Sequence, residues 1–463
     1  MSSVSLAESP FVGTDRLLAG IVLSVLTFWL FAQSVINVVP AMKSSLDISL
    51  ETLTLAVSLS ALFSGCFVVA SGGLADKFGR MRMTHIGLLL SIIGSALLVL
   101  AQGPGLFLTG RVLQGLSAAC IMPATLALIK TWYEGKARQR AVSFWVIGSW
   151  GGSGLCSFVG GAIATGLGWR WIFVFSIAVA LAALLLLRGT PESRSQSAQR
   201  QKLDISGLLS LIISLVLLNL FISKGHGWGW SSGLSLTMLA GSLLSASYFI
   251  RSGLRKGDAA LIDFALFRNR AYGAAVLSNF MLNGAIGTMM IASIWLQKGH
   301  NMSPLETGVM TLGYLVTVLA MIRVGEKLLQ RYGARLPMMT GPVVTAVAIL
   351  FISCTFLDKS VYIVTVFLSN VLFGLGLGCY ATPSTDTAVS NAPESKIGVA
   401  SGVYKMGSSL GGAMGIAVTA SLFALFLPLG MASAAQYALW FNAALCLGAM
   451  VVSALMLPRT PQS

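Results

Sequence analysis

The chain has 463 residues; 56% of them are hydrophobic, only 10% are charged, and the formal net charge at pH 7 is +15. This composition excludes an ordinary soluble globular protein. The lysines and arginines lie in short loops between apolar runs of about twenty residues, the length that crosses a bilayer. The positive charge therefore indicates membrane topology, and the absence of a basic patch with interleaved aromatic residues argues against a nucleic-acid partner.

Fourteen apolar runs predict an all-α integral membrane protein with fourteen spanning helices. We expect these helices near residues 17–39, 52–74, 83–102, 105–129, 141–163, 169–188, 203–223, 232–250, 271–296, 304–324, 337–357, 360–382, 397–426 and 434–457. The first run is too long for the core of a signal peptide, so it is expected to be a permanent span. An even number of spans puts both termini on one side. That side would hold 23 loop lysines and arginines against 5 opposite, which predicts cytoplasmic termini.

A charged, glycine-marked hairpin over residues 72–83 separates the second and third runs, and its glycines would let the chain reverse with positive φ. It resembles the loop signature of the major facilitator superfamily, Gly-x-x-x-Asp-Arg-x-Gly-Arg-Arg/Lys, with lysine for the first arginine. The residues in the signature positions are Gly72, Asp76, Lys77, Gly79 and Arg80. We interpret the hairpin as a gating loop whose acid pairs with a base or a helix N-terminus. The alternative is an ordinary positive-inside turn.

The fourth run contains an arginine inside a predicted span, in the string Arg111-Val-Leu-Gln-Gly115. An arginine inside a span is costly unless it is paired or faces water. The string resembles the Arg-x-x-Gln-Gly signature of the same superfamily, in which the arginine is tied to proton coupling. The alternative is an arginine that reaches back to the outer interface.

An internal repeat predicts two bundles. Leu50-Glu51-Thr52 opens the second span and Leu305-Glu306-Thr307 opens the tenth, each about one span ahead of a glycine-marked loop. The later loop, residues 325–335, is a divergent copy of the hairpin, with its acid moved to Glu326. The predicted domains are an N-terminal six-helix bundle over 17–188, linkers and two inserted helices over 189–270, and a C-terminal six-helix bundle over 271–457.

Longer strings narrow the resemblance. Residues 27–34, 147–154 and 380–388, with Val403-Tyr-Lys-Met, are similar to the Nor-type quinolone and multidrug efflux pumps of staphylococci, in the fourteen-helix drug:proton antiporter branch. The branch's helix-5 signature is matched by Gly160-Gly161, but Cys156-Ser157 replace its Gly-Pro, which weakens the inference of export direction from that motif.

The resemblance implies a proton-coupled multidrug efflux antiporter of a bacterial cytoplasmic membrane, exporting quinolones, quaternary ammonium compounds and dyes by rocking-bundle alternating access. It implies no enzyme and no cofactor, only the proton gradient, and a monomer as the expected state. The alternative is a carrier of the same fold for an endogenous solute, by uptake or export. A membrane enzyme or receptor is disfavoured because no nucleophile–base pair, metal spacing or phosphate loop is present.

Few ionisable residues lie where protons could bind, and Ala32 occupies the place where the branch usually has a helix-1 aspartate. The proton-coupling candidates are Glu51, Glu306, Lys405, Asp386 and Arg111. The two glutamates could instead be favourable helix N-terminal acids. Asp386, just past Pro383, could instead cap a short loop helix. Lys405 lies too deep in its span to reach the interface easily and would pair with an acid or set the charge of a cavity.

Our candidates for the substrate cavity are two sets of neutral side chains, each on one face of a helix, in two spans related by the repeat. The first set is Trp29, Gln33 and Asn37 in the first span, and the second is Asn279, Asn283 and Met290 in the ninth. Aromatic and methionine surface with a few amides suits amphipathic cations or zwitterions. The alternative for each residue is helix packing with amide hydrogen bonds.

Neither a disulfide framework nor a metal site is expected. The six cysteines lie singly in apolar runs, and the three histidines, His85, His226 and His300, lie at separate loops or helix ends.

Overall fold

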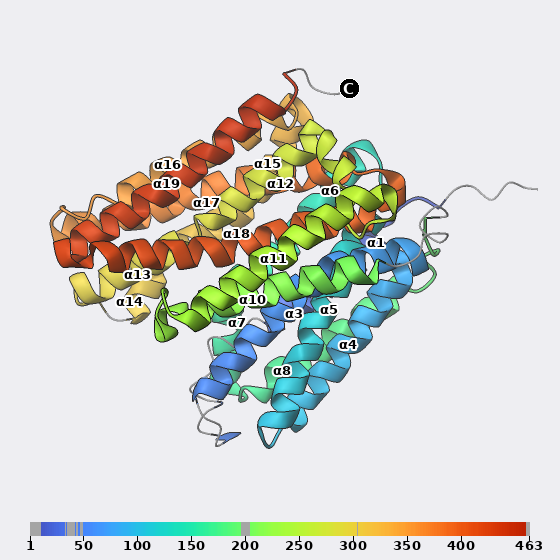
Figure 1. Ribbon diagram of the computed structural model, residues 1–463, viewed down its shortest axis with the longest axis horizontal. Coiled ribbons are helices and arrows are strands. Elements are labelled where there is room, and N and C mark those ends of the chain that lie inside the picture. Colours follow the sequence, from blue (N-terminus) through green and yellow to red (C-terminus); the bar gives the residue numbers. More distant parts are fainter. Residues whose placement is uncertain are drawn as a thin grey trace, which may run out of the picture.

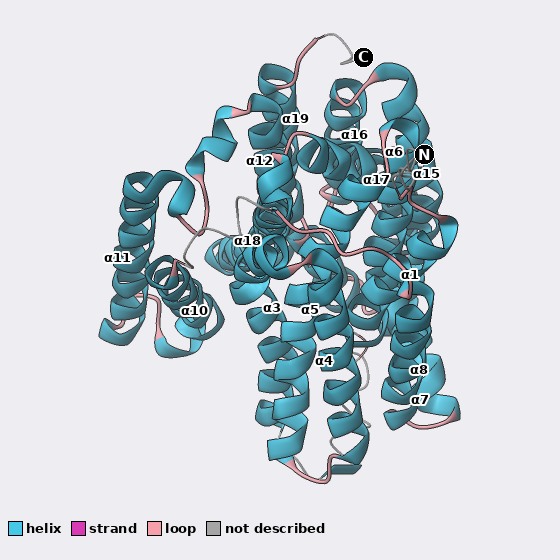
Figure 2. Ribbon diagram, turned by 90° about the vertical axis from the view of Figure 1, so that its right-hand side faces the viewer, coloured by secondary structure: helices cyan, strands magenta, loops and turns pink. Residues whose placement is uncertain are grey.

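The computed structural model of the protein describes residues 11–32, 34, 42, 45–46, 50–195, 204–302 and 304–459. All regular structure in these ranges is helical (Figures 1 and 2). Thirteen helices are long and apolar enough to cross a membrane, and a bent pair over residues 135–156 and 158–166 makes fourteen. The predicted number of spans therefore agrees with the described helices.

The helices fall into an N-terminal group, an inserted pair and a C-terminal group (Figure 1). The first group comprises α1 (Asp15–Leu26) with π-helical η1 (Thr27–Ala32), α3 (Leu50–Phe78), α4 (Arg80–Leu100), α5 (Pro104–Trp132), α6 (Gly135–Val146), π-helical η2 (Ile147–Gly151), α7 (Gly152–Gly166) and α8 (Arg170–Leu187). The inserted pair is α10 (Ile205–Trp228) and α11 (Gly233–Lys256).

The third group begins with α12 (Arg270–Gly284), α13 (Gly287–Ile294), π-helical η5 (Trp295–Gly299), α14 (Pro304–Met310) and α15 (Leu312–Tyr332). It ends with α16 (Arg335–Ile352), α17 (Lys359–Ser390), α18 (Ile397–Phe426) and α19 (Met431–Met456). Short 3₁₀ segments occupy Gly257–Ala259, Phe264–Arg268, Glu394–Lys396 and Leu427–Leu429. Spanning elements are helical because a bilayer offers their backbone groups no other hydrogen-bond partners.

The two main groups meet at the end of the molecule where α3 turns into α4, which we call the hairpin end. Figure 1 shows their helices running apart toward the opposite end, while Figure 2 shows α10 and α11 standing beside α18 and outside both groups. The first described residues lie at the hairpin end, where the amide of Gly13 donates to the carbonyl of Trp132. The last helix also ends there, since Arg335 donates to the carbonyl of Ala454.

Two expectations from the sequence are corrected by the structure. The expected gating loop is mostly helical: α3 continues to Phe78 and α4 begins at Arg80, so the hairpin turns at Gly79, whose φ is +126°. Pro383 does not end its helix, because α17 continues through it to Ser390. Proline is tolerated inside a span where neighbouring helices and Ser or Thr side chains satisfy the freed backbone groups. Asp386 is therefore a residue of α17 and no N-cap.

Candidate functional site

Asp76, in the last turn of α3, joins the two helix groups at the hairpin end. Its side chain is almost fully buried and accepts hydrogen bonds from the first amides of α18, those of Gly398 (3.0 Å) and Val399 (3.1 Å). It also accepts from Nε (3.2 Å) and Nη2 (3.0 Å) of Arg80. A carboxylate at a helix N-terminus, neutralised by a buried arginine, is a strong electrostatic contact. We call the set of contacts across the hairpin end the gate.

The backbones of α3 and α18 touch directly at the gate. A Cβ on Gly72 would lie 2.2 Å from the carbonyl oxygen of Gly398, and a Cβ on Gly398 would lie 2.3 Å from that of Gly72. One turn further along α18, a Cβ on Gly402 would lie 2.8 Å from the carbonyl oxygen of Val68. Only glycine permits this approach, so Gly72 acts by packing as well as by marking the hairpin.

Three basic side chains cross the gate, Arg80 among them. Arg80 donates to the carbonyl of Glu394 at 2.9 Å, and Lys130 donates to the carbonyls of Ser390 (3.1 Å) and Ala392. Arg138 of α6 forms an ion pair with the buried carboxylate of Asp386 in α17 at 3.1 Å. Asp386 therefore contributes to holding the two groups together in this conformation. The gate is closed.

The linker after α8 supports the gate, a role that the sequence did not suggest. The carboxylate of Glu192 accepts from the amides of Met81 and Arg82 in the first turn of α4, each at 2.9 Å. The amide of Ser195 donates to the carbonyl of Asp76 at 2.8 Å. Gly79 leaves room for this cap, since a Cβ there would lie 2.4 Å from the Glu192 carboxyl carbon. Nζ of Lys77 lies 5.7 Å from the ring centroid of Phe78.

The linker after α11 binds the other side of the gate. Lys396, just before α18, donates to Asp263 at 2.8 Å and to exposed Asp258 at 3.2 Å. Burial alone would raise the pKa of Asp263, but the ammonium of Lys396 and the amide of Ala265 outweigh it and hold that pKa below its usual value. Each linker of the inserted pair is thus fastened to one side of the gate.

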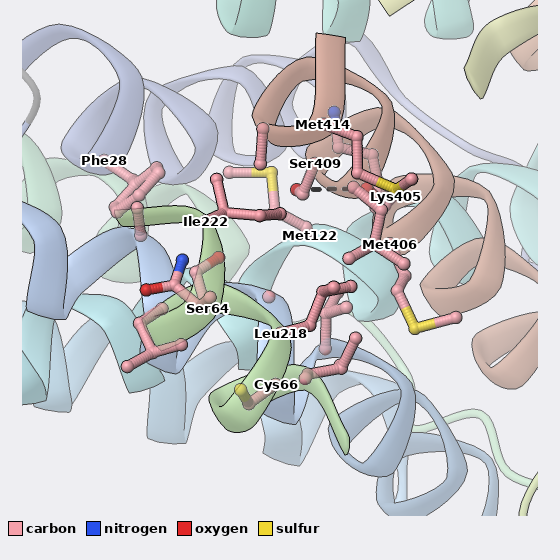
Figure 3. A pocket seen from close by; sticks show the side chains of 18 of the residues that line it. Phe28, Ser64, Cys66, Met122, Leu218, Ile222, Lys405, Met406, Ser409 and Met414 are labelled. Atoms are coloured by element: carbon pink, nitrogen blue, oxygen red, sulfur yellow. Dashed lines mark hydrogen bonds between the residues drawn. The ribbon is translucent and has the colours of Figure 1, made fainter. Parts of the chain in front are cut away.

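A cavity of about 290 Å³ lies between α3, α10 and α18 (Figure 3). Its wall is mostly aliphatic, aromatic and sulfur-containing, and Ser64, Asn219, Ser409 and Lys405 are its most polar members. The inserted helix α10 contributes four of the lining residues, which the sequence did not indicate. These are Leu215, Leu218, Asn219 and Ile222. Such a lining suits an amphipathic molecule of moderate size.

Lys405 lies at the edge of this cavity and is only 8% exposed. Its Nζ stands 5.3 Å from the ring centroid of Trp29 and 5.2 Å from that of Trp145. None of the described acidic side chains forms an ion pair with it. Pairing with an acid is therefore not seen among the described side chains. Their arrangement is compatible with the other expected role, in which Lys405 sets the charge of the cavity.

Arg111 of α5 is completely buried, which excludes in this structure the alternative that it reaches to the interface. Its guanidinium donates to the carbonyls of Ala56 (3.1 Å) and Ala32 (2.7 Å), to Oε1 of Gln114 (2.7 Å) and to Oγ of Ser60 (2.6 Å). It thereby ties α5 to α3 and η1. A buried cation held by neutral acceptors could exchange them for a carboxylate, which keeps it a coupling candidate.

The other candidates are dispersed. Glu306 is exposed near the start of the short helix α14, and the side chain of Glu51 lies outside the described part. Gln33 and Asn37 also lie outside the described residues. Trp29 lines the cavity.

The ninth-span candidates do not line this cavity. Asn279 donates to the carbonyl of Tyr404 (3.2 Å) and to Oγ of Ser408 (2.6 Å), which joins α12 to α18. Asn283 donates back to Asn279 at 2.8 Å, and Met290 packs against the hydrophobic core. These contacts match the packing alternative.

Comparison with known proteins decides the family. The family model of the Major Facilitator Superfamily matches residues 17–269 and 271–463. The chain belongs to the major facilitator superfamily. This major facilitator is a transporter and no enzyme. It is 52% identical to the quinolone resistance protein NorB of Staphylococcus aureus strain MRSA252 over 454 residues, which cover 98% of both chains. NorB of strain MSSA476 matches with the same identity and coverage.

Solved structures agree on the fold. The proton:xylose symporter XylE superposes with a TM-score of 0.69 at 16% identity, covering 96% of both chains. The human organic anion transporter MFSD10 superposes with a TM-score of 0.63 at 16% identity, covering 95% of this chain and 98% of that one.

Proposed function

We propose that this transporter is a multidrug efflux pump that exports amphipathic compounds, quinolones, quaternary ammonium compounds and dyes among them, in exchange for protons. Its sequence identity of 52% with the quinolone resistance protein NorB supports the substrate class. The observation that supports the mechanism is a gate that is closed at the hairpin end, together with an apolar cavity further along α3 and α18. A transporter in this state has closed one side, as alternating access requires.

We further propose that the hairpin end faces the cytoplasm of a bacterium, because it would carry most of the loop lysines and arginines. Residues 17–188 and 271–457 would then rock against each other as the two bundles, and the monomer would suffice. In the alternate state the gate contacts of Asp76 and Asp386 break, and drug enters from the cytoplasm or inner leaflet.

Proton coupling is assigned to the same moving parts. Asp386 and Arg138 part when the gate opens, so a proton that reaches Asp386 while the gate is closed would be released to the cytoplasm as the carboxyl group becomes exposed to water. Arg111 would exchange neutral acceptors for an acid, and Glu51 and Glu306 would serve the opposite end. The driving force is adequate for modest gradients, since 100 mV supplies about 2.3 kcal/mol per proton.

Paired drug and proton flux in proteoliposomes tests this proposal. Drug should move against its gradient when an opposing proton gradient is imposed, and Glu51→Gln or Glu306→Gln should abolish that coupling while leaving some drug binding. Pumping of a natural metabolite but of no quinolone, dye or quaternary amine would favour the alternative of an endogenous-solute carrier. Unchanged pH dependence in both variants would remove the two glutamates from the coupling set.

A further inference from the structure

Lys405 is a buried cation in an otherwise apolar place. It lies eight residues after Ile397, about 12 Å along the helix axis from the start of α18. Trp29 and Trp145 offer it two aromatic faces, which attract an ammonium group without neutralising it. None of the described ion pairs includes it. Its charge therefore remains uncompensated by any described carboxylate.

The adjoining cavity offers no acid either. No aspartate or glutamate is among the residues that line it, and Lys405 is the sole charged member of that lining. Ser64, Asn219 and Ser409 are its other polar contributors, against a majority of aliphatic, aromatic and methionine side chains. Figure 3 shows Lys405 beside Met406 and Ser409 on the α18 wall, opposite the α10 and α3 residues. A ligand therefore meets one positive charge, three neutral polar side chains and otherwise apolar surface.

We propose that Lys405 is a specificity-determining residue that binds the carboxylate of amphipathic acids and zwitterions whose apolar bodies fill this cavity. The proposal rests on the efflux function proposed above. A ligand carboxylate beside the ammonium supplies the negative charge that the described protein groups do not provide. The cavity partly desolvates both charges, which strengthens their attraction. Cations without an acid gain nothing from Lys405 and are repelled by it. The same cavity therefore treats the two drug classes differently.

Transport of matched compounds tests the role of this lysine. The probes are a quinolone with a free carboxylate, its methyl ester and ethidium, assayed in proteoliposomes containing wild-type protein or Lys405→Gln. The variant should raise KM for the acid at least about tenfold, equivalent to about 1.4 kcal/mol, with little change in turnover number. KM for the ester should stay within about twofold, and that for ethidium should stay or fall. Lys405→Arg should restore the preference for the acid.

Two controls keep the outcome interpretable. Lys298→Gln removes the same charge from an exposed site and should change no KM. Lys405→Met, which suits the methionine-rich wall, is measured in parallel so that the result does not depend on the folding of one variant. Equal increases in KM for acid and ester would overturn the proposal and leave efflux standing. If wild-type vesicles transport none of the compounds, the proposed function fails; binding of acid and ester by tryptophan quenching then decides the role of Lys405 by the same comparison.

Discussion

Replacing Asp76 with asparagine should weaken the closed gate without changing its shape. The carboxylate accepts four hydrogen bonds, two from Arg80 and two from the amides of Gly398 and Val399. Asparagine keeps one oxygen but presents an NH₂ group to donors, and it leaves the nearly buried guanidinium of Arg80 without its counter-ion. The two amide contacts exist only while α3 and α18 are together, and the unpaired Arg80 costs most in that state because the closed gate buries it.

The size of the effect follows from these contacts. Removing one partner of a buried ion pair costs about 3–5 kcal/mol, and asparagine retains part of the hydrogen bonding, so a loss of about 2–3 kcal/mol is expected. Because each 1.4 kcal/mol is tenfold, the equilibrium should move about 30- to 150-fold toward the open gate. A protein that rests with its gate open can bind drug from the hairpin side. It seldom passes to the closed-gate state that would release the drug on the other side, so efflux should fall.

Thiol labelling measures this shift. The side chain of Val399 faces Gly73 across the gate and is 8% exposed, so Val399→Cys in a background without the six native cysteines reports opening. A membrane-impermeant maleimide added from the hairpin side should label the Asp76→Asn protein faster than its parent. Asp358→Asn, an exposed site at the other end of the molecule, is the matched control. Equal labelling rates with and without Asp76→Asn would refute the assignment of a gate contact.

Three further predictions concern the same end of the molecule. Gly72→Ala places a Cβ 2.2 Å from a carbonyl oxygen of α18, so α3 and α18 must separate and drug efflux should fall at least about tenfold, whereas Gly105→Ala, where no atom lies within 4 Å, should be neutral. Glu192→Ala removes the cap of α4 and should destabilise the protein by about 1 kcal/mol, measured by thermal unfolding, and accelerate gate labelling. Asp386→Asn should also accelerate labelling, and exchanging the charges of Asp386 and Arg138 should recover part of the loss.

Hydropathy predicted the spans because the bilayer admits few other structures. It could not predict the partners of Asp76, since the amides of Gly398 and Val399 lie more than 300 residues away and carry no side-chain signal. The continuation of α17 through Pro383 was missed for a related reason: proline usually ends helices in water, where freed carbonyls find other partners. That error also hid the ion pair of Asp386.

The role of Glu192 had a signal that was not used. Helix α4 begins after Gly79, which has no side chain to cap it, so its first amides needed an acceptor from another segment. Glu192, in the polar linker after α8, supplies that acceptor. Similarly, the sequence predicted two inserted helices but not the surface against which they pack. Only the folded structure places Asn219 of α10 in the cavity wall.

Helix α18 connects the gate to the cavity. Its first amides are held by Asp76, and Lys405 projects from the same helix about two turns later. A rigid helix cannot shift at one of these points without moving the other. A carboxylate that binds Lys405 and displaces α18 would therefore also change the contact of that helix with Asp76. Inserted helix α10 lies along the same segment of α18, and its linkers are fastened to both sides of the gate. Substrate recognition and gate opening are therefore expected to be coupled through α18. In a variant that loses the Lys405 contact, the rate of gate labelling should no longer respond to an added acidic substrate. Without that substrate, the rate should equal that of the wild type.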